Sequence, residues 1–338
     1  MPAPTETSAC RSVSVICFSK MKPKIQLIIG NQYNPHLNLA VESSLLDEGD
    51  PEVVTMFLWK NQQTVVYGYN QNPFTECNVE LLLSEGGYAA RRRTGGGAVY
   101  HDLGNLNFSF VAHKKHYDVT KQMNVIKTAL RYFGLEAEVS GRNDILFEGR
   151  KFSGNAFGFY KDRRLHHGTI LIKTDGEKLA KYLKVNPAKL QKHGVKSVAS
   201  RIINLSEVAD ITSDSIIPYL SKAFEEVYNA KADVVAFNDL LTDKVLKTRD
   251  LFASDEYLFG KWRNFHAKKS AQFSWGLVEL DMQVNEEKGL IESISIASDG
   301  LKPELIEETE RILTGASIKK APDCGGNEVA KDILTLIY

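Results

Sequence analysis

The stretch RRRTGGGAVYHDLGN, residues 91–105, is the most distinctive part of this 338-residue chain. Its three consecutive glycines let the backbone approach a ligand closely, and their N–H groups can form a cradle for an anion. The stretch is not a P-loop, because no Gly-Lys-Ser/Thr follows, and it lacks the Gly-x-Gly-x-x-Gly pattern. If residues 90–94 are extended, Arg91 and Arg93 share one face and Arg92 takes the other, so one or two arginines can reach a common pocket. A plain turn is the alternative for the glycines, but a plain turn needs neither the arginines before it nor the Tyr-His-Asp after it.

A second stretch, GRNDILFEGRKFSGNA at residues 141–156, places Lys151 at the edge of a tight turn. Its neighbours Ser153, Gly154 and Ala156 are small, which leaves room for a ligand beside the lysine amine. The competing interpretation is a lysine on the protein surface, the usual place for a lysine at a turn.

A third stretch, HHGTIL at residues 166–171, offers the hydroxyl of Thr169 to one face of a predicted strand. The adjacent His166 and His167 point to opposite faces of such a strand. This pair therefore predicts no two-histidine metal site.

The three stretches combine glycines, arginine and lysine but contain no evident nucleophile. This combination suits the activation of a carboxylate by ATP. The substrate carboxylate attacks the α-phosphate itself, so the protein supplies cations and N–H donors that stabilise charge on the carboxylate and phosphoryl oxygens. Mg²⁺ normally binds and neutralises the triphosphate. We therefore predict a nucleotide-dependent site that activates a carboxylate.

The overall charge excludes some classes of function. The chain carries 42 Lys and Arg against 42 Asp and Glu, which argues against a general nucleic-acid or membrane-surface binder. The positive charge is nevertheless concentrated, because residues 91–201 contain 22 basic and 9 acidic residues. No apolar run approaches the ~18 residues that a transmembrane helix requires.

The cysteines and the N-terminal segment bear on the compartment. The four cysteines form no Cys-x-x-Cys pair, which is typical of reduced intracellular thiols; they are Cys10, Cys17, Cys77 and Cys324. Residues 1–20 are poor in acidic side chains and are predicted to be a disordered extension. We expect a cytoplasmic protein, or a mitochondrial or other organellar one if residues 1–20 are a targeting peptide.

Hydrophobic periodicity predicts an α+β chain with mixed and antiparallel sheets. A strand is expected over 25–29, hairpins over 53–69 and 273–297, and an antiparallel meander over 143–173. Helices are expected from Asn34 to Gly49, from Thr120 to Gly134, and over 214–228, 303–314 and 326–336. The less regular stretch 229–250 is predicted to be a linker, so the rest of the chain forms a small second domain.

Together these motifs resemble the lipoate–protein ligase A family. The similarity runs from about Met21 onward, and the three stretches quoted above carry it most specifically. NLAVESSLL, VVYGYNQNPFTECN and KSVASRIINL support it, and FSWGLVEL resembles the accessory domain of the bacterial-type enzymes. Two departures concern Tyr69, where relatives commonly have arginine, and EYLFGKW (256–262), which replaces a Trp-rich stretch.

The resemblance implies a biotin/lipoate protein ligase-like catalytic domain over residues 21–245 and a small α+β accessory domain over residues 251–338. It implies an AMP-forming ligase of lipoate salvage that converts lipoate and ATP, with Mg²⁺, into lipoyl-AMP and pyrophosphate. The lipoyl group then passes to a lysine of the acceptor domains of 2-oxoacid dehydrogenase complexes or of the glycine-cleavage H protein. A monomer that binds no nucleic acid and no membrane is expected.

The resemblance also assigns roles to individual residues. Lys151 corresponds to the catalytic lysine that contacts both the lipoyl carbonyl and the phosphate, and Arg92 to the nucleotide-binding arginine. The other expected contacts to ATP or lipoyl-AMP are Gly97, Ala98, Val99, Tyr100, Arg142, Thr169, Val198 and Ser200, the last two within the adenylate-binding loop Lys192–Arg201. Gly97 and Lys151 are expected to contact lipoate together with His101, and no residue is assigned to a metal. Asp144 is the candidate base of the second step, with a structural turn residue as the alternative.

Other functions remain open from the sequence. A close relative transfers lipoyl groups only from preformed lipoyl-AMP, although the accessory domain weighs against that activity here. An ATP-independent octanoyl or lipoyl acyltransferase needs a cysteine nucleophile, and the internal candidates Cys77 and Cys324 lie outside the motifs. The intact Lys151 and glycine stretch disfavour a module that only sequesters lipoate or a nucleotide. The residues of the three motifs disfavour a biotin ligase of the same fold.

Overall fold

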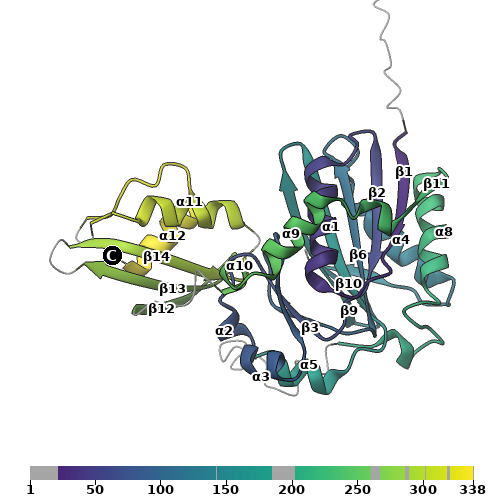
Figure 1. Ribbon diagram of the computed structural model, residues 1–338, viewed down its shortest axis with the longest axis horizontal. Helices are drawn as coiled ribbons and strands as arrows, with labels where there is room; N and C mark the ends of the chain where they lie inside the picture. The colour runs from purple at the N-terminus through teal and green to yellow at the C-terminus, as the bar shows by residue number, and fades with distance from the viewer. Residues whose placement is uncertain are drawn as a thin grey trace, which may run out of the picture.

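A computed structural model describes residues 22–141, 143–184, 202–259, 267–285, 289–300, 302–317 and 320–337 of the chain. Among these residues, eight strands form one mixed sheet in the order β11-β1-β2-β6-β10-β9-β8-β7 (Figure 1). The strands are β1 (Lys24–Ile29), β2 (Val53–Trp59), β6 (Asn105–His113), β7 (Glu138–Ser140), β8 (Asp144–Phe147), β9 (Arg150–Tyr160), β10 (Arg163–Leu171) and β11 (Ala232–Ala236). β1 runs parallel to both β11 and β2, and the other neighbouring pairs are antiparallel.

Helices cover both faces of this main sheet (Figure 1). On one face, α4 (Val119–Arg131) and α8 (Ile217–Tyr228) pack on a core that includes Met56. On the other face, α1 (Pro35–Glu48) and α9 (Asp243–Ala253) pack on a core that includes Phe57. Because Met56 and Phe57 are neighbours in β2, their side chains alternate between the faces, and the strand is buried on both faces.

The predicted helices are present, and α1 and α4 follow the expected capping rules. The Asn34 side chain accepts a hydrogen bond from the Leu37 N–H at 3.0 Å, and Pro35 occupies the first turn of α1. Gly49 caps the other end of this helix. After α4, Gly134 adopts a positive φ of 75°, a conformation that glycine reaches without a side-chain clash.

A second sheet stands beside the first and contradicts one prediction. Among the described residues it has three strands, in the order β4 (Tyr88–Arg91), β3 (Thr64–Tyr67) and β5 (Val99–His101). The predicted hairpin over 53–69 is wrong, because β2 pairs with β1 and β6 while β3 pairs with β4 and β5. The segment between β2 and β3 does not form a hairpin turn. The Asn38 amide of α1 donates to Lys60 O and Asn61 Oδ1 and so holds this segment against the helix.

The meander predicted over 143–173 is confirmed, because β8, β9 and β10 pair antiparallel in sequence order. Glu148 and Gly149 carry positive φ angles of 49° and 72° at the first turn. Lys161 has a φ of 51° at the second turn. These tight turns place Lys151 at the start of β9 and Thr169 near the end of β10.

The linker predicted over 229–250 is wrong. β11 adds a parallel strand to the edge of the main sheet, a short 3-10 turn follows (η2, Phe237–Leu240), and α9 buries Val245 and Phe252 against α1. The edge position explains the weak sequence signal, because Val234 in β11 remains 72% exposed. The following helix α10 (Asp255–Phe259) buries Leu258 and Phe259 in the core of the second sheet.

Three short helices complete the second sheet. They are α2 (Pro73–Glu76), α3 (Val79–Ser84) and α5 (Gly176–Tyr182), and a 3-10 turn, η1 (Leu205–Glu207), leads back toward α8. Their apolar residues Val79, Leu82 and Tyr182 enter the same core as Leu258 and Phe259.

The C-terminal part forms a separate small unit, shown at the left of Figure 1. Its strands β12 (Ala267–Phe273), β13 (Gly276–Asn285) and β14 (Leu290–Ser298) pair antiparallel and support α11 (Pro303–Leu313) and α12 (Glu328–Ile337). The second predicted hairpin and the α+β class are thereby confirmed. None of the helices in the described ranges is both long and apolar enough to span a membrane.

Candidate active site

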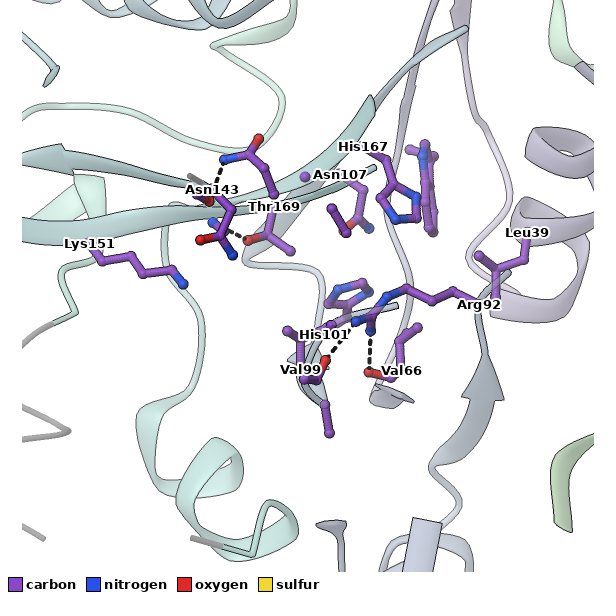
Figure 2. Close-up of a pocket in the computed structure, with 18 residues that line it drawn as sticks. Leu39, Val66, Arg92, Val99, His101, Asn107, Asn143, Lys151, His167 and Thr169 are labelled. Carbon is purple, nitrogen blue, oxygen red and sulfur yellow. Dashed lines mark hydrogen bonds between the residues drawn. The ribbon is translucent and has the colours of Figure 1, made fainter. Parts of the chain in front are cut away.

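One pocket lies between the two sheets and collects most of the predicted site residues (Figure 2). Its lining includes seven of them, namely Arg92, Gly97, Ala98, Val99, His101, Lys151 and Thr169. The glycine stretch and β5 form one wall, and the face of the main sheet that α1 covers forms the floor. Residues that are far apart in the sequence therefore meet at one place.

The register of the strands sets the floor of the pocket. Trp59 of β2 lies opposite Asn107 of β6, and Asn107 lies opposite Thr169 of β10, so these three side chains form a row across the sheet. Leu39 of α1 and Val66 of β3 add apolar surface at the Trp59 end. The sequence alone did not indicate Trp59, Asn107, Leu39 or Val66, because strand alternation gives the face of a residue but not which strands are neighbours.

Lys151 lies at the opposite end of the pocket from Leu39 (Figure 2). Its Nζ is 2.7 Å from Asp144 Oδ1, and both side chains are about one-third exposed, which leaves the ammonium group accessible to a ligand. Gly154 makes room for this side chain, because a Cβ at Gly154 would lie 3.0 Å from Nζ. The Lys151 carbonyl also accepts a hydrogen bond from the Ile203 N–H at 3.0 Å, which fixes the backbone of the lysine.

The three consecutive arginines have three different environments. Arg91 is buried and donates to backbone carbonyls of the 68–71 turn and of α10. Arg93 lies 2.7 Å from an Asp47 carboxylate oxygen at the end of α1. Only Arg92 lines the pocket, so the sequence prediction that not all three can reach a common pocket is confirmed.

Arg92 shapes the glycine stretch around its guanidinium. Nη2 donates to Gly95 O at 2.7 Å and to Gly97 O at 2.8 Å, and Nη1 donates to Val66 O at 3.2 Å. Burial lowers the pKa of Arg92 to about 10, so the group stays charged at neutral pH. The glycines are needed here, since Gly96 has a φ of 94° and a Cβ on Gly68 would lie 2.3 Å from Gly96 O.

A chain of buried hydrogen bonds links Arg92 to α1. Arg92 Nε donates to Thr94 Oγ1 at 3.1 Å, Thr94 Oγ1 lies 2.8 Å from His167 Nε2, and His167 Nδ1 lies 2.8 Å from Glu42 Oε1. Ser109 also donates to the same Glu42 oxygen, and Trp59 Nε1 donates to Ser109 Oγ at 3.0 Å. These bonds satisfy the polar groups of His167 and hold the arginine and the tryptophan in fixed positions.

His166, the neighbour of His167, points to the other face of β10 as predicted. Its Nε2 lies 2.9 Å from Asn155 Oδ1 and its Nδ1 lies 3.0 Å from Gln122 Oε1. Burial lowers the pKa of His166 to about 3, so the ring is neutral. In the described part of the chain, no group of three or more His, Cys, Asp or Glu residues could hold a metal ion.

The remaining predicted residues lie elsewhere or outside the described ranges. Tyr100 is buried on the other face of β5, where its ring packs 5.7 Å from that of Tyr182, and it does not line the pocket. The structure does not describe residues 1–20, Arg142 and the loop Lys192–Arg201, which includes Val198 and Ser200.

Comparison with known proteins agrees with this geometry. The family model described as "Lipoyl protein ligase A/B catalytic domain" matches residues 34–225, and the model "Bacterial lipoate protein ligase C-terminus" matches residues 263–322. Lipoate-protein ligase A of Bdellovibrio bacteriovorus is 40% identical over 304 residues, which cover 88% of this chain and 89% of that protein.

Two solved structures are similar to this protein over most of their own length. LipL1 of P. falciparum in complex with lipoate superposes with a TM-score of 0.77 at 31% identity and covers 92% of this chain and 99% of its own. A lipoate-protein ligase A bound with ATP superposes with a TM-score of 0.59 at 25% identity, covering 71% of this chain and 99% of its own. From these matches over most of its length, the chain belongs to the lipoate-protein ligase A family.

Proposed function

We propose that this protein joins lipoate to acceptor proteins in two steps at the pocket between the sheets. In the first step, a carboxylate oxygen of lipoate bonds to the α-phosphorus of ATP, and pyrophosphate leaves with the electrons of the broken P–O bond. In the second step, the amine of an acceptor lysine bonds to the lipoyl carbonyl carbon of lipoyl-AMP, AMP leaves, and the amine loses a proton. The observation that carries the proposal is the meeting of Lys151, Arg92 and the glycine stretch in one pocket.

The pocket has the asymmetry that an acyl adenylate needs. Lys151 supplies a positive charge at one end, where the carboxylate and the α-phosphate must meet, and this charge stabilises the oxygens in the transition state. The row that ends at Trp59, with Leu39 and Val66, offers apolar surface for the acyl chain at the other end. We propose that lipoate binds in this orientation, with its carboxylate at Lys151 and its ring at Trp59.

Nucleotide contacts follow from the same arrangement. We assign Arg92, Gly97, Ala98, Val99, Thr169 and Lys151 to the adenylate, and motif similarity adds Tyr100, Arg142, Val198 and Ser200. Magnesium enters as part of the substrate MgATP, carried by the phosphates. We infer the acceptors to be lipoyl domains of 2-oxoacid dehydrogenase complexes and the glycine-cleavage H protein, as the family resemblance implies.

A cysteine-dependent acyltransferase receives no support from the described residues. Cys77 and Cys324 are both buried, and neither lines the pocket. Burial raises the pKa of the Cys77 thiol to about 12 and raises that of Cys324 as well, so little of either is the reactive thiolate at neutral pH.

The proposed division into a catalytic and an accessory domain needs one adjustment. The resemblance gives residues 21–245 and 251–338, but α9 and α10 pack on the large body through Phe252, Leu258 and Phe259. We therefore propose that the boundary follows α10.

The proposed function is tested by supplying MgATP with lipoate, octanoate or biotin and measuring AMP and pyrophosphate. We expect pyrophosphate release with lipoate and none with biotin. An apo lipoyl domain is then added, and its mass should rise by one lipoyl group per acceptor lysine. Absence of lipoate-dependent pyrophosphate, with transfer from supplied lipoyl-AMP intact, would show a transferase in place of a ligase.

A further inference from the structure

The side chain of Lys151 reaches the pocket because β9 contains one extra residue. In the pairing of β8 with β9 the register shifts and skips Phe152, so that Leu146 lies opposite Lys151. Side chains alternate along a regular strand, and counting back from Gly154 in the pocket would put Phe152 in the pocket and Lys151 on the opposite face. Phe152 is instead fully buried in the core beneath α4 and α8, and Lys151 lines the pocket (Figure 2). This β-bulge therefore directs the lysine into the site.

Residues 202–207 hold β9 at this bulge, beyond the end of its ladder with β10. That ladder stops short of Lys151. The Ile203 N–H donates to the Lys151 carbonyl at 3.0 Å, and the Ile203 side chain is buried in the main core. The Ser206 N–H donates to the carbonyl of Ile172, the residue after β10, at 2.9 Å. The segment 202–207 therefore links the bulge to the end of β10.

Two polar side chains, those of Asn204 and Glu207, anchor this segment. Asn204 Oδ1 accepts a hydrogen bond from the Thr174 N–H at 2.9 Å, and Asn204 Nδ2 donates to Thr174 O at 3.0 Å. Glu207 Oε1 accepts from the Asn204 N–H at 3.0 Å, and Glu207 Oε2 lies 3.7 Å from Arg150 Nη1. Because Arg150 precedes Lys151 in β9, the segment contacts the strand at both residues.

The two anchors differ in strength. The Arg150 and Glu207 side chains are 39% and 52% exposed, and an ion pair in such a setting contributes little. Asn204 instead forms two hydrogen bonds to one backbone position, which fix the orientation of its amide. Neither Asn204 nor Glu207 lines the pocket, so any effect of these side chains on the reaction has to pass through Lys151.

We propose that Asn204 and Glu207 are positioning residues for the adenylation step and act by keeping Lys151 in the bulged conformation. The proposal rests on the proposed function, in which Lys151 stabilises the oxygens of the carboxylate and the α-phosphate. Without its anchors the segment 202–207 no longer fixes the Lys151 carbonyl, and regular pairing of β8 with β9 would turn the ammonium group away from the pocket. Such a displacement is costly, because a shift of about 1 Å in a catalytic group can lower a rate by about 100-fold.

The first measurement is lipoate-dependent exchange of labelled pyrophosphate into ATP. We expect exchange to fall by about 10-fold in Asn204→Ala and by about 3-fold in Glu207→Ala, in line with the strength of the two anchors. Glu207→Gln keeps an oxygen for the Asn204 N–H and should restore exchange to nearly the wild-type rate. Asp118→Ala is the matched control, since it removes a cap bond of 3.0 Å to the Lys121 N–H at the start of α4 and should leave exchange normal.

The second measurement separates an effect through Lys151 from a general structural loss. Asn204→Ala is repeated in the Lys151→Ala protein, where the ammonium group is absent and no further loss of exchange is expected. The position of the lysine is also read by its acetylation with an N-hydroxysuccinimide ester, relative to Lys231, whose side chain is 90% exposed. The sulfamate analogue of lipoyl-AMP, at about 10 times its Kd for each protein, should protect Lys151 by about 10-fold in the wild type and by less than about 3-fold in Asn204→Ala.

Unchanged exchange in a folded Asn204→Ala protein would overturn the inference. An equal loss in the Lys151→Ala background, or full protection of Lys151 in Asn204→Ala, would do the same. If Asn204→Ala does not fold, Glu207→Ala and Glu207→Gln carry the test, and equal exchange in these two variants contradicts the role of Glu207. In all these cases normal exchange in the wild type leaves the proposed function intact, whereas a wild type without lipoate-dependent exchange contradicts that function and the inference with it.

Discussion

Asp144 and Lys151 face each other at the mouth of the pocket, with Oδ1 and Nζ 2.7 Å apart. The pair gives Asp144 two candidate roles, as a holder of Lys151 in the first step and as acceptor of the proton that the attacking lysine loses in the second. We expect Asp144→Asn to slow lipoyl transfer from supplied lipoyl-AMP by about 100-fold, because an amide cannot take up that proton. Transfer is measured by mass spectrometry of the acceptor domain, with Asp144→Glu as the variant that keeps the carboxylate. A normal transfer rate in Asp144→Asn would exclude the role of base.

For individual residues, the sequence predicted the members of the site better than it predicted the hydrogen bonds between them. The alternation of side chains in an extended segment correctly separated Arg92 from its neighbours and His166 from His167. The chain from Arg92 through His167 to Glu42 was not predicted, because Glu42 and His167 are 125 positions apart and only the fold brings α1 over β10. The available signal was an acidic residue, Glu42, within the predicted buried stripe of α1.

Among the elements, β9 contributes most to the geometry around Lys151. Gly154 lies against the lysine side chain, and a Cβ at this position would come within 3.0 Å of Nζ and 3.1 Å of Cε. We expect Gly154→Ala to displace the ammonium group and lower lipoate-dependent pyrophosphate exchange by about 10-fold, since small misplacements of a catalytic group are costly. Gly176→Ala at the start of α5, where a Cβ meets no atom within 4 Å, is the control and should keep normal exchange. Equal exchange rates in the two variants would contradict this role of Gly154.

The elements with a strong local signal were predicted correctly, and the errors came from pairing. Asn34 and Gly49 mark the ends of α1 by their own chemistry, and the tight turns at Glu148 and Lys161 define the meander. The hairpin over 53–69 failed because two neighbouring β-rich segments can join different sheets, and the deciding contact, Asn38 with the Lys60–Asn61 connection, is long-range. The linker predicted over 229–250 was wrong because β11 is a short edge strand whose sequence, ADVVA, does not alternate between apolar and polar residues.

For the whole molecule, buried neutral histidines make stability depend on pH. Burial lowers the pKa of His101 and of His166 to about 3, whereas an unfolded histidine titrates near 6.5. Between these values the unfolded state binds more protons than the folded state, so the free energy of unfolding falls as pH decreases from about 6.5 toward 3 and is fully retained above 6.5. Each histidine contributes at most about 1.4 kcal/mol per pH unit to this slope.

The measurement is urea unfolding at a series of pH values for the wild type and for His166→Phe. The phenylalanine fits among the aromatic neighbours Phe108 and Phe157 and cannot be protonated. The variant should therefore show a shallower loss of stability below pH 6.5. Parallel curves for the two proteins would contradict a neutral His166 in the fold.

The uneven charge of the molecule predicts how the acceptor arrives. Residues 91–201 carry 22 basic and 9 acidic side chains in a chain whose total charge is zero. If this region attracts acidic acceptor domains, the transfer rate from lipoyl-AMP should fall by up to about 10-fold as salt rises from about 0.05 to about 0.5 M, because salt screens the attraction. Release of the lipoyl group to hydroxylamine, a small neutral nucleophile, should stay constant. A transfer rate that does not change with salt would rule out this attraction.

We propose that Lys151 stabilises the transition state in which the lipoate carboxylate attacks ATP. The most direct measurement is lipoate-dependent exchange of labelled pyrophosphate into ATP by the wild type and by Lys151→Ala, with melting temperatures measured alongside. We predict exchange in the wild type and a loss of at least about 100-fold in Lys151→Ala at an unchanged melting temperature. Near-normal exchange in a folded Lys151→Ala protein would contradict this role of Lys151.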